Sequence, residues 1–260
     1  MIKKIILSIG FVFIFAHLGF GENSAWNKKE DRHFVIYYQN APHDFVENVA
    51  QTAEELYTEI TRNLGFVRYQ NWSFEERAKI YIYDDREEYK ANARNMEWSG
   101  GMTFVNLKEI RTYAADYGFF DSTLPHELGH IIFHEFIQYN PVPLWLDEGV
   151  AMYQEKAKRW GANKVVQGYL ESGKFIPLDQ LTSDKLRNNP TEENVNIFYA
   201  EAASIVYYMI TEEGEYRFAT FCRKLTEGIK FEEALQQSYG RFRDLKSLNE
   251  AWVSYLKDLK

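Results

Sequence analysis

The sequence contains a single cysteine, Cys222, so no disulfide can form within the chain. A fold exported to an oxidising compartment would then have to rest on its apolar core. Basic residues are in the minority: 30 Lys and Arg stand against 38 Asp and Glu, which gives a formal net charge of −8. An acidic chain without a basic cluster is a poor partner for nucleic acid or for an anionic membrane surface. We therefore expect no nucleic-acid partner.

The sequence also lacks internal repeats and low-complexity linkers. A chain of 260 residues can bury a sizeable core as one or two domains. Aromatic residues are abundant by contrast, at 17% of the sequence. Most of them are expected to pack in that core.

The longest apolar run lies at the start of the chain. Lys3 and Lys4 precede apolar residues 5–20, and Gly19 and Gly21 place small residues at positions −3 and −1 of a cleavage site. This pattern predicts a secretory signal peptide over residues 1–21, cleaved after Gly21, and hence export to the periplasm or the medium. The alternative is an uncleaved membrane anchor, although the run is short for a span. A lipid anchor on cysteine is not expected, because no cysteine lies near the cut.

Residues 22–120 predict an N-terminal lobe with a small mixed sheet. Alternating apolar residues predict strands at 33–38, 79–83, 102–105 and 110–113. Apolar residues at helical spacing predict a long helix over 44–64, and a short polar helix is expected over 85–94.

The pattern that organises the rest of the chain is His-Glu-Leu-Gly-His at residues 126–130. Residues at i and i+4 share one face of a helix, so His126 and His130 can place two imidazoles on one metal ion. Glu127, one position further round, can take a proton from a water on that metal without being a ligand. This five-residue pattern is typical of a zinc-binding helix. The alternative is two packed or solvated histidines on an ordinary amphipathic helix.

A second acidic stretch follows after a turn. Glu148 stands 18 positions after His130, enough for a second helix to return across the first and supply a carboxylate ligand. Gly149 and Ala151 are small, so we expect the two helices to approach closely there. Asp147 could instead be the ligand or a hydrogen-bonding partner of one. A solvated acid in the first turn of a helix is the simpler alternative.

The two stretches together, H-E-L-G-H and W-L-D-E-G-V-A, resemble the gluzincin metallopeptidases, specifically the small peptidase-MA-like proteins. This resemblance covers roughly residues 104–256. It implies that His126, His130 and Glu148 bind zinc and that Glu127 is the general base. The metzincin pattern fits worse, because it requires a glycine and a third histidine where this chain has Phe133 and Phe136. His134 is expected to pack or to form a hydrogen bond rather than to bind metal.

The C-terminal part, residues 121–260, is expected to be a zinc-binding and mostly helical unit. A helix is predicted over 196–209, after a polar loop, and further helices over 216–226, 231–238 and 245–256. The first of these is similar to a family helix whose early tyrosine points at the active site. In that position Tyr199 could donate a hydrogen bond to the oxyanion of the reaction intermediate. Packing is the alternative role for a tyrosine early in a helix.

The segment Gly100-Gly101-Met102-Thr103-Phe104 is similar to the Gly-x-Met-Glu-Asn segment of gluzincin aminopeptidases. In those enzymes the glutamate pairs with the free α-amino group of the substrate. Thr103 occupies the matching position here and cannot neutralise an ammonium group. The sequence therefore favours cleavage of internal peptide bonds.

The sequence as a whole predicts an α+β, zincin-like fold: a small mixed sheet, a metal-binding helix and a mostly helical C-terminal lobe. It predicts an exported zinc metallopeptidase that acts on peptides or proteins. The alternatives are a zincin fold that binds without catalysis, or a zinc hydrolase of another amide or ester. The presence of Glu127 argues against the first, since a binding site has no chemical need for a general base.

Overall fold

The computed structural model describes residues 26–66, 72–92, 100–114, 118–182 and 191–259. The predicted signal peptide, residues 1–21, lies outside these ranges, and so does most of the polar loop predicted before residue 196. No helix within the described ranges has both the length and the apolar character needed to cross a membrane.

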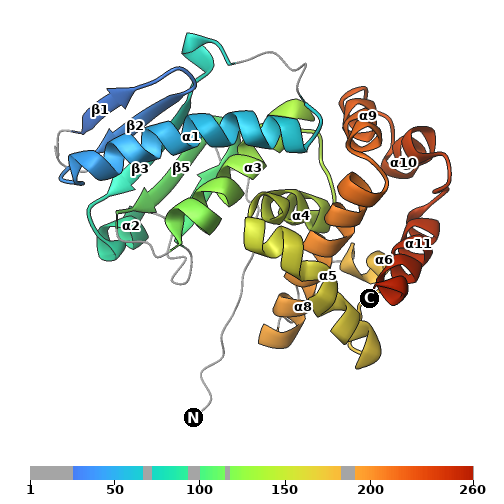
Figure 1. The fold of residues 1–260 in the computed structure, drawn as a ribbon. Helices are drawn as coiled ribbons and strands as arrows, with labels where there is room; N and C mark the ends of the chain where they lie inside the picture. Colours follow the sequence, from blue (N-terminus) through green and yellow to red (C-terminus); the bar gives the residue numbers. More distant parts are fainter. Residues whose placement is uncertain (1–25, 67–71, 93–99, 115–117, 183–190, 260) are drawn as a thin grey trace.

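The N-terminal half holds one five-stranded sheet among the described residues (Figure 1). Its strands are β1 (Asn27–Glu30), β2 (Phe34–Tyr38), β3 (Ala78–Tyr83), β4 (Gly101–Phe104) and β5 (Glu109–Tyr113). The strand order is β1-β2-β3-β5-β4, with parallel pairing of β3 to β2 and β5. β1 and β4 pair antiparallel at the two edges, so the sheet is mixed, as predicted. β1 is not among the strands that the sequence predicts.

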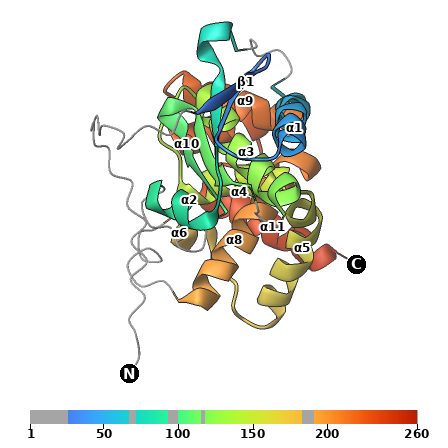
Figure 2. The same ribbon diagram turned by 90° about the vertical axis from the view of Figure 1, so that its left-hand side faces the viewer.

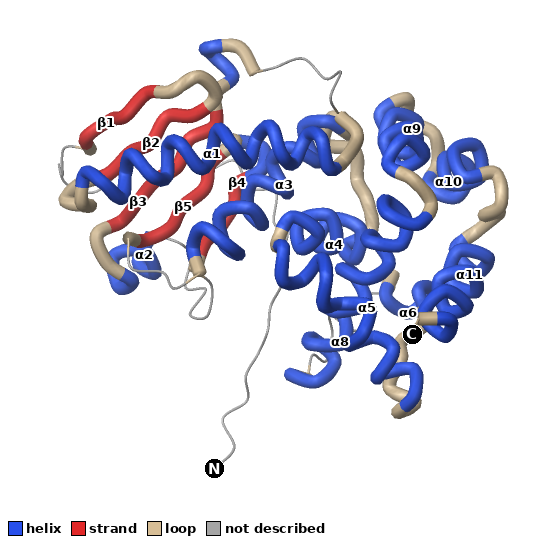
Figure 3. Tube along the Cα trace, in the orientation of Figure 1, coloured by secondary structure: helices blue, strands red, loops and turns tan. Residues whose placement is uncertain are grey.

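Helices make up most of the other described residues (Figure 3). Those of the first half are α1 (His43–Asn63), α2 (Arg86–Asn92) and α3 (Leu124–Phe136). The second half contains α4 (Leu144–Gln154), α5 (Lys156–Glu171), α6 (Leu178–Leu181), α8 (Glu192–Tyr207), α9 (Glu215–Thr226), α10 (Phe231–Tyr239) and α11 (Leu245–Asp258). α5 was not predicted from the sequence.

α1 and α3 pack on the same face of the sheet and against each other (Figure 2). Val49, Ala53 and Ile60 of α1 are buried at helical spacing in the same core as the sheet residues Ile36 and Ile80. The apolar stripe of α1 thus covers the strands, as the periodicity predicts. α3 lies beside the edge strand β4 and faces α4 on its other side.

Two glycines allow α4 to lie close to its neighbours. A Cβ on Gly129 of α3 would lie 3.0 Å from the Cα of Ala151, which is tighter than most real Cβ contacts. A Cβ on Gly149 would collide with the backbone carbonyl oxygen of Ala202 on α8. The prediction for Gly149 is therefore wrong: Ala151 marks the close approach to α3, whereas Gly149 faces α8.

The predicted fold class is confirmed. A small mixed sheet precedes a central helix, and the C-terminal half is helical, an arrangement consistent with a zincin-like α+β fold.

Candidate metal centre

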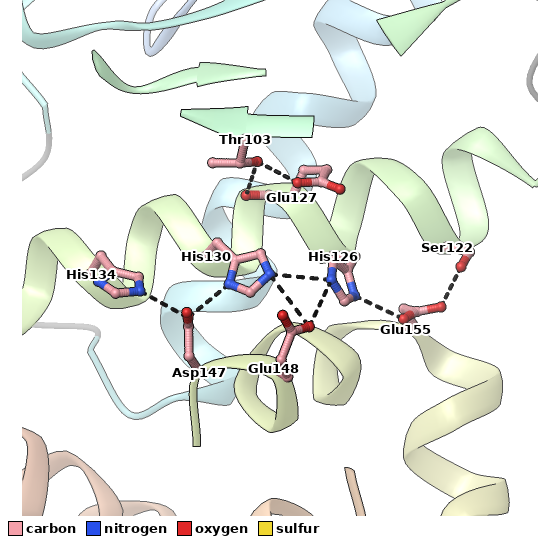
Figure 4. A network of polar contacts seen from close by, with 9 residues as sticks. All are labelled: Thr103, Ser122, His126, Glu127, His130, His134, Asp147, Glu148 and Glu155. Atoms are coloured by element: carbon pink, nitrogen blue, oxygen red, sulfur yellow. Dashed lines mark hydrogen bonds and ion pairs between the residues drawn. The ribbon is translucent and has the colours of Figure 1, made fainter. Parts of the chain in front are cut away.

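His126 and His130 lie on one face of α3, one helical turn apart (Figure 4). Their Nε2 atoms are 3.2 Å apart. Pro125 stands in the first turn, where a missing N–H costs the helix nothing. Buried Leu128 and Ile132 anchor the helix in the core, so the two imidazoles are held in place by the packing of α3.

Glu148 approaches the same point from α4. Its Oε2 atom lies 3.6 Å from Nε2 of His126 and 3.9 Å from Nε2 of His130. One ligand atom from each of the three residues falls within 4.8 Å of the other two. The residues that the sequence predicts as ligands are thus brought together on two facing helices.

The spacing of these three atoms suits a zinc ion. Two ligands at 2.0–2.1 Å from a tetrahedral zinc lie about 3.3 Å apart. The two Nε2 atoms match this separation, and the slightly longer distances to Glu148 allow an ion between the three groups. Two imidazoles and a carboxylate are also ligands that zinc prefers, with a fourth position left for water.

The other ring nitrogen of each histidine meets a carboxylate. Nδ1 of His126 lies 3.0 Å from Glu155, and Nδ1 of His130 lies 2.8 Å from Asp147. Each carboxylate accepts a hydrogen bond from an Nδ1–H, which leaves the Nε2 atoms to face Glu148. Sequence reasoning left the role of Asp147 open, and the structure places it as such a partner.

Sequence reasoning missed Glu155. It stands seven positions after Glu148, two helical turns on, so it returns to the side of α4 that faces α3. It also accepts a hydrogen bond from the hydroxyl of Ser122, in the turn that leads into α3. The seven-residue spacing from Glu148 is the signal that could have identified Glu155 in the sequence.

His134, one turn beyond His130, lies beside the centre. Its Nε2 atom is 2.9 Å from the same Oδ1 atom of Asp147 that contacts His130. His130, His134 and Asp147 could also be considered as metal ligands. The separations of 2.8–2.9 Å between Asp147 and each histidine are those of directly paired polar groups and are too short for ligands around one zinc ion. We therefore place the metal centre at the first group.

The electrostatics of the centre favour a positive charge. Burial lowers the pKa of His130, but the carboxylates of Asp147, Glu148 and Glu127 outweigh it and raise the pKa to about 10. Burial raises the pKa of Glu148 despite the nearby histidines. Burial also acts to raise the pKa of Asp147, yet His130 holds that pKa well below its ordinary value. The excess of negative charge from these carboxylates would stabilise a cation bound between the Nε2 atoms and Glu148.

Glu127 points the other way, toward the edge strand β4 (Figure 4). Its Oε2 atom accepts a hydrogen bond of 2.5 Å from the hydroxyl of Thr103. The carboxylate is thus held apart from the histidines, although its charge reaches the centre.

Tyr199 lies in the first half of α8 and packs beside Met152 and Ala203. Burial raises the pKa of Tyr199 well above its ordinary value, and the charges of Glu148 and Glu127 raise it further. The phenol therefore stays neutral and can donate a hydrogen bond, and it lies within electrostatic reach of both carboxylates.

The fold is consistent with a zincin-like protein, and this donor set is a candidate metal site between α3 and α4. A family model described as the Peptidase MA superfamily matches residues 70–258. The chain therefore belongs to this superfamily, which suggests a metallopeptidase-like function on peptide or protein substrates. Members of the superfamily are typically metal-dependent, and the groups described above are candidate metal ligands. No curated protein matches the chain.

Proposed function

We propose that this protein is an exported zinc metallopeptidase that cleaves internal peptide bonds. His126, His130 and Glu148 hold the zinc ion, Glu127 is the general base, and Tyr199 is a hydrogen-bond donor. The observation that carries the proposal is the convergence of three ligand atoms within electrostatic reach of a carboxylate that is not one of them. A purely structural zinc site is closed by four ligands and needs no such carboxylate.

The residues divide the chemistry between them. A bound zinc ion would polarise the scissile carbonyl and lower the pKa of a water molecule toward about 7. Glu127 takes one proton from that water as its oxygen bonds to the carbonyl carbon. The same carboxyl group returns the proton to the leaving nitrogen as the C–N bond breaks. The Tyr199 phenol donates a hydrogen bond to the oxyanion formed in between.

Two features of β4 support cleavage of internal bonds. Thr103 stands where the related aminopeptidases carry the glutamate that pairs with an amino terminus. Its hydroxyl contacts Glu127 instead, and it carries no charge to neutralise an ammonium group. β4 is the edge strand of the sheet, and its outer edge can pair with an extended peptide at any point along that peptide.

The residues of this site also bear on two alternative functions. A protein that binds without catalysis would not require Glu127 to be kept free of the metal ligands. A zinc hydrolase of another amide or ester would use the same ligands and base, so only substrate profiling separates it from a peptidase.

The test combines metal analysis with peptide cleavage. Purified protein lacking residues 1–21 is expected to contain one zinc per chain and to cleave a peptide library at internal bonds. A peptide and its N-acetylated form should be cut at similar rates. Removal of residues one at a time, abolished by acetylation, would identify an aminopeptidase instead. Zinc binding with no cleavage would favour the binding function.

Export is tested separately. The full chain expressed in a bacterial host should appear outside the cytoplasm with Glu22 as its new amino terminus. Retention in the membrane at full length would indicate an uncleaved anchor.

A further inference from the structure

The edge strand β4 lies directly against the part of α3 that carries Glu127 (Figure 4). β4 is bonded to β5 along one edge only, because it ends the sheet. Two of its four residues, Gly101 and Thr103, contact Glu127 or lie next to it. The strand therefore contributes to the surroundings of the proposed base.

Thr103 fixes one oxygen of Glu127. The Thr103 hydroxyl is 2.5 Å from Oε2 of the carboxylate and 3.4 Å from the backbone carbonyl oxygen of the same residue. A hydroxyl carries one proton and can donate it to one acceptor at a time. The shorter distance and the ionised acceptor both favour the carboxylate, since charge-assisted hydrogen bonds are the stronger ones.

Gly101 leaves room for the other oxygen. A Cβ placed on Gly101 would lie 3.4 Å from Oε1 of Glu127 and 3.3 Å from its Cγ. The same Cβ would lie 2.6 Å from Cγ2 of Thr123, a distance that real Cβ atoms do not show. Any side chain at this position would require the strand or the Thr123 side chain to shift. The absence of one lets Thr103, two residues on, reach the carboxylate.

We propose that Gly101 and Thr103 form a seat that holds Oε2 of Glu127 and leaves Oε1 to carry the proton. This inference rests on the proposed function, in which Glu127 is the base. Oε1 takes the proton of the attacking water and gives it up to the leaving nitrogen, while the hydrogen bond from Thr103 to Oε2 stays in place throughout. Thr103 is a positioning residue: it fixes the direction of the base and does not touch the substrate.

Kinetics test the positioning role. Thr103→Val keeps the shape of the side chain and removes the hydroxyl, so kcat is expected to fall on the order of tenfold, as for loss of other residues that orient a catalytic group. KM and zinc content should stay unchanged, because neither depends on the direction of Oε1. Thr103→Ser keeps the hydroxyl and is expected to restore most of kcat. Unchanged kcat in Thr103→Val, or a loss that Thr103→Ser does not restore, would overturn the proposal.

Thermal unfolding of the zinc-free protein tests the contact without any activity. Thr103→Val should lower the Tm by about 2–4 °C in the wild-type background, as expected for loss of one hydrogen bond in a chain of this size. In a Glu127→Ala background, where the acceptor is gone, it should change the Tm very little. Equal shifts in the two backgrounds would show that Thr103 and Glu127 are not coupled and would overturn the seat.

Thr112→Val is the matched control. Thr112 is the residue of β5 that pairs with Gly101, and its hydroxyl donates to the carbonyl oxygen of Gly100. It does not contact Glu127, so its substitution should lower the Tm equally in both backgrounds and leave kcat within about twofold. A wild-type protein that binds zinc but cleaves nothing would contradict the proposed function, and the unfolding measurements would still decide whether the seat exists.

Discussion

The two sides of α3 hold the proposed metal ligands and the proposed base by different means. On the side of α4, three carboxylates surround the histidines: Glu148 faces both Nε2 atoms, whereas Asp147 and Glu155 each face an Nδ1 atom. On the side of β4, Glu127 meets an uncharged hydroxyl and a glycine. A carboxylate beside a histidine ligand fixes the position of the proton on that histidine, which helps metal binding. A general base, by contrast, must be held by an uncharged group, because a charged neighbour could exchange the proton in its place.

The largest effect is expected from substitutions on the side of α3 that faces α4. Glu148→Ala is expected to remove most of the bound zinc, because two histidines alone make an incomplete site. Asp147→Ala should leave most of the zinc in place, because Asp147 acts through His130. Metal analysis of both purified variants checks this. If Asp147→Ala loses the metal and Glu148→Ala retains it, the assignment of the third ligand is wrong.

Tyr199, on α8, lies within electrostatic reach of Glu148 and Glu127. Tyr199→Phe removes one hydroxyl and little packing, so kcat is expected to fall on the order of 10²-fold if the phenol donates to the oxyanion. Tyr207→Phe, on the same helix and half-buried, is the matched control and should be neutral. An unchanged kcat in Tyr199→Phe would mean that this tyrosine only packs.

Glu155 sharpens the comparison, because its carboxylate acts through His126. Glu155→Gln keeps the size of the side chain and removes its charge, so zinc affinity is expected to fall by about 10–100-fold. Competition with a chelator measures this change. Glu59→Gln, a substitution of a partly exposed glutamate that pairs with Lys156, serves as the control. An affinity equal to that of the wild type would show that the contact with Nδ1 does not matter to the metal.

Glu201 is a carboxylate on α8 that belongs to neither side of α3. It is fully buried and accepts a hydrogen bond from the backbone N–H of Ile176, while its Oε2 has no partner among the described residues. Burial raises the pKa of Glu201 to about 8, from an ordinary value of 4.5. The folded state therefore binds a proton that the unfolded state releases, and stability falls as the pH rises from 4.5 to 8.

Glu201→Gln mimics the protonated acid and should remove the loss of folding stability at high pH. We expect little change in stability at pH 5 and a gain on the order of 2–5 kcal/mol at pH 9. Chemical unfolding at both pH values measures it. Glu213→Gln is the contrasting variant: Glu213 is paired with Arg241 at 2.9 Å, so its loss should destabilise the protein at both pH values. Equal effects of Glu201→Gln at pH 5 and pH 9 would contradict the account.

The sequence predicted those parts of the fold and site that depend on local patterns. The spacing of His126 and His130 is read from one helix, and the apolar stripe of α1 is read from another. β1 escaped prediction because it is a polar edge strand, Asn-Lys-Lys-Glu, without the alternation of a half-buried strand. α5 escaped because exposed Trp160 and Val165 interrupt its apolar stripe.

The remaining parts depend on how elements meet in space. The contact between Thr103 and Glu127 requires the edge of the sheet to lie on α3, across 24 positions of sequence. Which helix Gly149 contacts depends on whether α3 or α8 lies on that face of α4. The periodicity of the sequence does not predict this. Glu155 contacts His126 only because α4 ends beside that histidine.

The most direct test of the central claim is made on one variant. Glu127→Gln is nearly isosteric and removes the base without removing a ligand. Zinc content and turnover are measured on the same preparation. We predict one zinc per chain and a kcat lowered by at least about 10²-fold. A variant that keeps its zinc and turns over at a near-normal rate would contradict the claim that Glu127 is the base.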